Sequence, residues 1–390
     1  MRPTLQAFMG TGFSESPSFH DFVSTLKALS TNNGDNLVSD WQELRYFDPF
    51  GLTAAEIVIQ ERLADIKIKY ENVGGMILAK IPLAQKSIAV NQYHFFANES
   101  VINGKVGKTV ISPARIQSSQ TNSPDALAAS LWDDVISAAA KNPDPQTIES
   151  NESVSSKEVS KSDENLNSAA TAESAVRIFR ELFQNSIEHA GNQSNFIYRR
   201  GQFFKAHNRV QITIGNNRDT FFGRLRASAR YKEDFFKPEE GKSNAETLDM
   251  QAAAFAMFPG LSRKAFSTPR KVESEFKFDQ GVGLYILSEL ARACGSMIIF
   301  SGESSIICRS STEPIIIRKL PFLFPGTLIG LSLDVKKLSF FTEIVDNAVY
   351  KAAQFWNQDK NGIRDVNIKA SESPTYYSDL LLSFNKFKTS

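Results

Sequence analysis

"RELFQNSIEHAGNQ", residues 180–193, is the last part of a segment with helical periodicity that begins near Glu173. Its apolar residues recur every three or four positions, which predicts an amphipathic helix from about Glu173 to His189. The stripe that this helix would bury consists of Val176, Phe179, Phe183 and Ile187.

Three polar residues of the same segment, Glu181, Asn185 and Glu188, are spaced four and three positions apart. Residues at this spacing lie on one side of a helix. Two interpretations follow. The residues belong to a solvated helix face, or they line a nucleotide site that holds a magnesium ion. Motifs elsewhere in the chain are needed to distinguish these two interpretations.

Composition narrows the class of protein. The chain has 390 residues, of which 42% are hydrophobic, so we expect a globular protein of two or three domains. The net charge of +1 gives no electrostatic indication of a nucleic acid or an anionic membrane as partner. No run of 18 apolar residues and no secretory signal is visible, so we expect a cytoplasmic protein without membrane association.

The two cysteines, Cys294 and Cys308, belong to no C-x-x-C pair and to no cluster with histidine. A structural zinc site and a disulfide framework are therefore not expected. This cysteine usage agrees with a reducing compartment.

Residues 141–174, "KNPDPQTIESNESVSSKEVSKSDENLNSAATAES", contain no aromatic residue and are rich in Ser, Glu, Asn and Lys. Such a stretch cannot bury enough apolar surface to offset its ordering entropy. We therefore expect a small α/β domain with a lead segment in 1–140, a flexible linker in 141–172, a second domain in 173–338 and a helical tail in 339–390.

Periodicity and turn signals predict the elements of both halves. After a weakly structured lead, the first half is expected to contain strands at 43–47, 66–70 and 75–81, a turn at 48–51 and helices at 52–66, 84–96 and 123–142. In the second half we expect strands at 195–204, 209–216, 296–302, 304–311 and 327–337, and helices at 173–189, 244–258, 281–295 and 341–358.

The second half combines the asparagine helix with two glycine motifs, "DQGVGLYIL" (279–287) and "FPGTLIGLSLDV" (324–335). In this order the motifs resemble the GHKL ATPase superfamily, which includes gyrase, MutL, heat-shock chaperones and histidine kinases. The resemblance covers about 173–338. It implies an α/β sandwich with a mixed sheet and helices on one face, and it implies ATP and Mg²⁺ as cofactors.

The resemblance also implies roles for single residues. Asn185 would give magnesium an oxygen ligand, and Glu181 would orient or deprotonate the attacking water. Backbone N–H groups at Gly281 and Gly283 would approach the phosphates. The implied nucleotide-binding set is Asn185, Glu188, Asp219, Gly281, Gly283, Leu284 and Thr327. Residues 223–280 would form a lid whose cations, Arg263, Lys264, Arg270 and Lys271, meet the γ-phosphate.

One position departs from the family pattern. GHKL proteins read the adenine amino group with an aspartate in a D-x-G-x-G turn after the strand that matches "VQITI". Here Gly215 or Asn216 stands at that place, and Asp219 is the nearest acid. Three alternatives remain: Asp219 takes over, the base is read differently, or nucleotide binding has been lost.

The first half resembles the STAS-like domains that precede some GHKL domains, on "FDPFGLTAAEIVIQERL" (47–63) and "AVNQYHFF" (89–96). STAS antagonists carry a phosphorylatable serine at the strand-to-helix turn. Here Thr53 is the hydroxyl nearest to that turn, so a binding surface is expected rather than a phosphorylation switch.

Taken together, the motifs favour a regulatory protein in which ATP and magnesium close the lid and switch contacts with a protein partner, with slow hydrolysis resetting it. A homodimer is compatible with this expectation. A non-catalytic interaction module with a degenerate site, and a serine kinase resembling anti-sigma-factor kinases, remain as alternatives.

Overall fold

The computed structural model describes residues 7–8, 17–31, 48–65, 110–117, 123–140, 169–189, 196–204, 209–226, 248–257, 283–310 and 312–358. The expected strands at 43–47, 66–70 and 75–81 and the expected helix at 84–96 lie outside these residues. The same holds for most of the expected linker and for most of the expected lid.

The described strands form one five-stranded sheet in the order β1-β2-β3-β5-β4. Their bounds are β1 Val110–Gln117, β2 Phe196–Phe204, β3 Arg209–Asn216, β4 Gly295–Cys308 and β5 Ile316–Asp334. All four neighbouring pairs of described strands are antiparallel, so the mixed sheet that was expected is not found among them. The reason lies in the last hairpin: β3 and β4 run in the same direction, but β5 returns between them.

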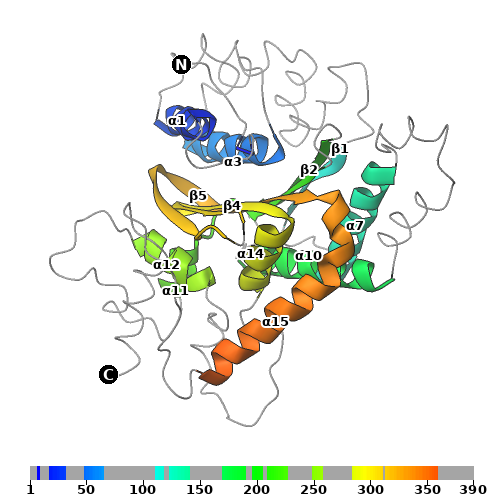
Figure 1. Cartoon of the computed structure of the whole chain (residues 1–390). Coiled ribbons are helices and arrows are strands. Elements are labelled where there is room, and N and C mark those ends of the chain that lie inside the picture. The colour runs from blue at the N-terminus through cyan, green and yellow to red at the C-terminus, as the bar shows by residue number, and fades with distance from the viewer. Residues whose placement is uncertain are drawn as a thin grey trace.

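Helices cover both faces of the sheet (Figure 1). One face carries α1 (Pro17–Thr31) and α3 (Pro49–Asp65), and the other carries the remaining long helices. These are α7 (Pro124–Ala140), α10 (Ala169–His189), α12 (Leu248–Met257), α14 (Gly283–Cys294) and α15 (Phe341–Gln358). The α/β class is therefore confirmed. Helices on one face were expected for residues 173–338, and the long helices described in that range, α10, α12 and α14, do share one face. The helices of the other face, α1 and α3, come from the first half of the chain.

The two cores follow from strand alternation. On β3, Ile212 and Ile214 point into the core under α10 and α14. On the opposite face, Phe300 of β4 lies among Phe22 of α1 and Phe50 of α3, with ring centroids 5.9 Å and 5.0 Å away. The sheet therefore has two apolar faces, and each of them packs against one layer of helices.

The described parts of residues 1–140 share this sheet and these cores with the second half. β1 pairs with β2, and Trp132 of α7 packs beside Phe179 of α10 with ring centroids 6.4 Å apart. A buried ion pair joins Glu56 of α3 to Arg200 of β2 at 3.2 Å. The boundary expected near residue 140 therefore does not separate two independently packed bodies among the described residues, because β1, α7, α1 and α3 bury their apolar surface against the later strands.

The start of α3 also differs from the expected turn at 48–51. The helix begins at Pro49, and the carboxylate of Asp48 caps it by accepting the N–H of Gly51 at 2.7 Å. Thr53 is buried and its hydroxyl donates to the carbonyl of Pro49, so it is not accessible for phosphorylation. Residues 17–31, expected as part of a weakly structured lead, form α1.

Two further strand predictions need correction. The strands expected at 296–302 and 304–311 are one strand, β4, with an irregularity at Ser301–Ser304 where Gly302 adopts φ +59°. β5 begins earlier than expected, at Ile316. Within the described part of the chain, no helix is both long enough and apolar enough to span a membrane.

Candidate functional site

The helix of the opening stretch, α10, packs on the sheet as its periodicity predicts. Phe179 and Phe183 are fully buried against the core, while Glu181 and Asn185 are partly buried. Glu188 belongs to the helix, but its side chain lies outside the described residues. α10 thus presents a carboxylate and a carboxamide at i and i+4 beside the layer of α14 and α15.

The first residue of α14, Gly283, lies directly against Glu181. A Cβ atom added at residue 283 would be 3.1 Å from Glu181 Oε2 and 3.3 Å from Glu181 Cβ. A glycine at this position therefore lets the start of one helix meet the carboxylate of another. The helix start supplies backbone N–H groups without intrahelical partners, which suit an anion or the oxygens of a phosphate.

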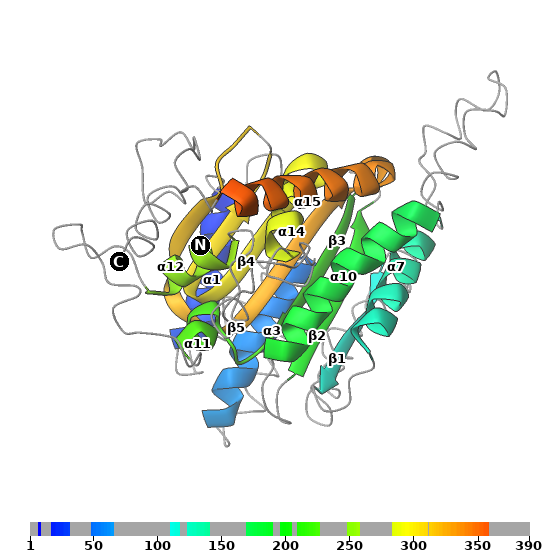
Figure 2. The same cartoon turned by 90° about the horizontal axis from the view of Figure 1, so that it is seen from below.

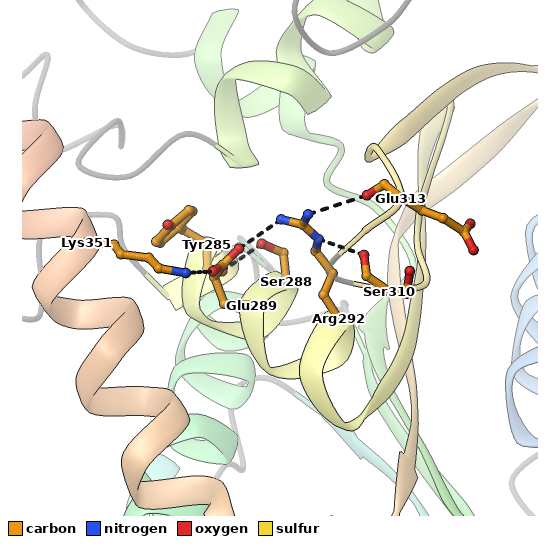
Figure 3. A network of polar contacts seen from close by, with 7 residues as sticks. All are labelled: Tyr285, Ser288, Glu289, Arg292, Ser310, Glu313 and Lys351. Atoms are coloured by element: carbon orange, nitrogen blue, oxygen red, sulfur yellow. Dashed lines mark hydrogen bonds and ion pairs between the residues drawn. The ribbon is translucent and has the colours of Figure 1, made fainter. Parts of the chain in front are cut away.

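The far part of α14 is fixed by a polar network (Figure 3). Glu289 accepts from Arg292 at 3.0 Å and from Lys351 of α15 at 2.9 Å. Arg292 also donates through Nε to the carbonyl of Ser310, just beyond β4, at 3.0 Å. These contacts tie the second half of α14 to α15 and to the β4–β5 connection.

On the same face of the sheet, three polar residues form one row across neighbouring strands. Asn216 of β3 is the register partner of Thr327 of β5, which in turn pairs with Ser301 of β4. The next row toward the interior, Ile214, Ile329 and Ile299, belongs to the apolar core. The polar row therefore marks the point where this core ends.

Geometry places the polar row and the start of α14 at the same end of the face. α14 has 12 residues and runs directly into β4, against which it packs, so it spans about 18 Å back along the strand. From Gly295 to Ser301, β4 covers about 20 Å. Gly283 consequently lies near the level of Ser301. The view from below shows α14 beside β4 (Figure 2).

The polar row holds the turn that follows β3. The Oδ1 atom of Asn216 accepts the backbone N–H groups of Arg218 at 3.2 Å and of Asp219 at 3.0 Å. The Thr327 hydroxyl donates to the carbonyl of Asp219 at 2.7 Å. The Asp219 carboxylate forms an ion pair with Arg224 of α11 (Phe221–Arg226). Both the backbone and the side chain of Asp219 are thus engaged within the turn.

Gly326 lets β5 approach this turn. Its φ is +139°, and a Cβ atom there would lie 2.2 Å from the carbonyl oxygen of Asn216. Only glycine fits this backbone conformation and this distance without displacement. Gly326 therefore lets Thr327 lie next to Asn216 in the polar row.

No group of three or more His, Cys, Asp or Glu side chains gathers as a metal site in the described part of the chain. Asn185 offers an amide oxygen one turn from Glu181. Magnesium is commonly held by one or two protein oxygens together with phosphate oxygens and water.

The structure brings together part of the predicted site. Glu181 and Gly283 are in contact. Thr327 and Asp219 are also in contact, at the same end of this sheet face. Leu284 packs against the core. Gly281 and the four expected lid cations lie outside the described residues.

Sequence reasoning missed Ser301, the third member of the row, and Arg224, the partner of Asp219. Ser301 stands in a serine- and glycine-rich stretch that gave no signal of a site. Arg224 follows Asp219 at a spacing that becomes meaningful only with the short helix α11.

Comparisons with a set of protein-family models, with the curated proteins and with the solved structures found no match for this chain.

Proposed function

We propose that this chain is a cytoplasmic regulatory protein whose α10–α14 site binds a nucleoside triphosphate with magnesium and hydrolyses it slowly. ATP is the nucleotide that the GHKL resemblance implies. Nucleotide binding would alter contacts with a protein partner.

The observation that carries the proposal is the contact between Glu181 and Gly283. A carboxylate that lies against the N-terminus of a helix can orient a water toward a phosphate held by the N–H groups of that helix. Two motifs that are far apart in sequence meet at the place where this chemistry needs them.

The proposed role of Asn185 is to contribute one oxygen to the magnesium ion. The absence of a carboxylate cluster among the described residues supports a metal that binds with the nucleotide. Magnesium supplies charge neutralisation at the phosphates when bound. Asn185 would orient this complex, and Glu181 would hold the proton abstracted from water.

At the other part of the site, the ion pair between Asp219 and Arg224 bears on the three alternatives for base recognition. A carboxylate that already pairs with a guanidinium is poorly suited to bind an amino group of a base. We therefore favour a base that is read differently, without Asp219 as the acceptor.

A thermal-shift titration with ATP and magnesium tests the proposal, because a ligand bound by the native state alone raises the melting temperature. In Asn185→Ala, the affinity for the magnesium–nucleotide complex should fall at least about tenfold, or 1.4 kcal/mol. Asn347→Ala on the exposed side of α15 is the matched control and should bind as the wild type does.

Magnesium alone should give no shift. If neither ATP nor another nucleoside triphosphate binds at millimolar concentration, the proposal fails, and the alternative of a non-catalytic interaction module is favoured. Transfer of labelled phosphate to a protein substrate would instead favour the serine-kinase alternative.

A further inference from the structure

We infer that Arg224 of α11 binds the phosphates of the nucleotide and that Asp219 holds the Arg224 guanidinium in place. Both residues would act in the site of the proposed function, on which the inference rests. The four cations that the resemblance implies for this role do not include Arg224.

α11 begins at the same end of the sheet face as α14. The N–H group of Phe221, the first residue of α11, donates to the hydroxyl of Ser301 on β4 at 2.9 Å. Gly283, the first residue of α14, lies near the level of Ser301 along the same strand. Both helices lie on the same side of the sheet (Figure 1). Arg224, one turn into α11, therefore belongs to the end of the face where the N–H groups of α14 suit phosphates.

The guanidinium of Arg224 is held in a defined orientation. Its Nη2 atom donates to the carboxylate of Asp219. Asp219 is itself anchored to the sheet, because its N–H donates to Asn216 at 3.0 Å and its carbonyl accepts from Thr327 at 2.7 Å. An arginine that is held in this way loses little side-chain entropy when it binds a ligand.

Part of this guanidinium remains available to a ligand. Among the described residues, Asp219 is the one polar partner of the Arg224 side chain, which is 16% exposed. Nε is buried and lacks a hydrogen-bond partner. Nη1 makes no hydrogen bond to a described residue either, yet it is not buried, so a phosphate oxygen can reach it from solvent. A partly desolvated guanidinium with unused N–H groups favours an anionic ligand, and its planar fork matches the oxygens of a phosphate.

The segment around Arg224 is positive as a whole. Residues 216–226 contain three arginines and one aspartate, so their net charge is +2. The other two arginines, Arg218 and Arg226, are exposed. Asp219 therefore orients Arg224 without cancelling the positive potential that attracts phosphates to this surface.

Competition of ATP and of inorganic tripolyphosphate with a fluorescent ATP analogue, in the presence of magnesium, tests the inference, because tripolyphosphate carries the phosphates without the base. On the full chain, Arg224→Gln should weaken the binding of both ligands at least about tenfold, or 1.4 kcal/mol. Arg226→Gln removes an exposed arginine from the same helix and should bind both ligands as the wild type does. Melting temperatures establish that both variants fold.

A double-mutant cycle tests the positioning role of Asp219. Asp219→Ala should weaken the binding of both ligands, because Arg224 loses the partner that orients it. Adding Asp219→Ala to Arg224→Gln should cause no further loss, since Asp219 acts through Arg224. Additive losses would overturn this role of Asp219.

Weaker binding of both ligands in Arg224→Gln, with unchanged binding in Arg226→Gln, supports the inference. Unchanged ATP affinity in Arg224→Gln, or an equal loss in Arg226→Gln, overturns it and leaves the proposed nucleotide site standing. A loss for ATP alone, or no competition by tripolyphosphate in the wild type, also overturns it, because Arg224 would then not bind phosphates. If ATP does not bind the wild type, the proposed function fails and the inference fails with it. If Arg224→Gln does not fold, Arg224→Lys, which keeps the charge and loses the planar fork, takes its place with the same expected direction.

Discussion

Gly283 and Glu181 touch: a Cβ atom on residue 283 would lie 3.1 Å from the Oε2 atom of Glu181. This distance is tighter than most contacts that a Cβ atom makes, so a side chain at 283 would require the carboxylate to shift by a few tenths of an ångström. The contact joins the start of α14 to the middle of α10. It makes the position of Glu181 depend on a glycine that lies far away in the sequence.

Gly283→Ala should therefore slow nucleotide hydrolysis while leaving the fold intact. The added methyl group displaces Glu181 from its place at the helix start, whereas alanine is itself a good helix residue. We expect a fall in turnover of at least about tenfold, which corresponds to 1.36 kcal/mol in the activation barrier. Phosphate release under saturating nucleotide measures the turnover.

The matched control is Gly223→Ala on the exposed side of α11, where the new Cβ would lie 3.2 Å from the Thr220 hydroxyl alone. Its turnover should equal that of the wild type. Unchanged turnover in Gly283→Ala would mean that Glu181 does not act on the attacking water.

Gly326→Ala should destabilise the protein, because residue 326 adopts φ +139° and a Cβ there would overlap the carbonyl oxygen of Asn216. A strained φ of this kind costs about 1–3 kcal/mol, and the overlap adds to it. We expect the free energy of unfolding in urea to fall by at least about 2 kcal/mol. A change within about 0.5 kcal/mol would show that β5 can move away from the turn at little cost.

Much of the helix and strand content could be predicted from the sequence, because the relevant patterns are local. β3 was expected at 209–216 and is found there, and the tail helix was expected at 341–358 and is found there. α1 was missed although Phe19, Phe22 and Leu26 recur at helical spacing. A short apolar stripe in an otherwise polar lead was taken as a weakly structured segment.

The arrangement of the strands could not be predicted in the same way. β4 was divided because Gly302 and the neighbouring serines are typical of a turn, whereas the structure accommodates them as an irregularity within one strand. The separate first domain was inferred from the composition of 141–174. Composition describes that stretch alone and carries no information on whether α7 packs against α10.

The site shows the same division between local and long-range information. Glu181 and Asn185 were identified from their spacing on one helix. The use of both lone pairs of Asn216, and its pairing across the strands with Thr327, depend on contacts between distant segments. No pattern within β3 indicates these contacts.

Asp48 should give the stability of the protein a specific dependence on pH. Its carboxylate is 1% exposed and accepts the backbone N–H groups of Ala7 at 2.6 Å and Phe8 at 2.7 Å as well as that of Gly51. Burial raises the pKa of Asp48 to about 6, against the hydrogen bonds that lower it. In the unfolded chain the pKa returns to the ordinary value of 3.8.

The sign follows from linkage. Between pH 3.8 and 6 the folded state binds a proton at Asp48 that the unfolded state has released, so this group's contribution to stability is full below pH 3.8 and is lost as the pH rises through 6. The amplitude is about 3 kcal/mol. Asp48→Ser keeps a helix cap and removes the titration, so the free energy of unfolding in urea should lose this component relative to wild type. Identical pH profiles for both proteins would contradict the assignment to Asp48.

Cleavage of the chain within residues 141–168 should leave two fragments that remain associated. A specific protease site introduced into this stretch would separate β1 and α7 from α10 and β2 in sequence but not in space. The antiparallel pairing of β1 with β2 and the packing of Trp132 on Phe179 would still hold the parts together. On size-exclusion chromatography both fragments should elute in one peak, and they should separate in denaturant.

Trp132→Ala removes a buried aromatic side chain at a cost of about 3–5 kcal/mol and should release the first fragment. Tyr350→Ala, at a position that is 64% exposed, should not release it. If the first fragment of the wild type elutes alone as a folded species, residues 1–140 form an independent domain after all, and the shared sheet contributes little to their stability.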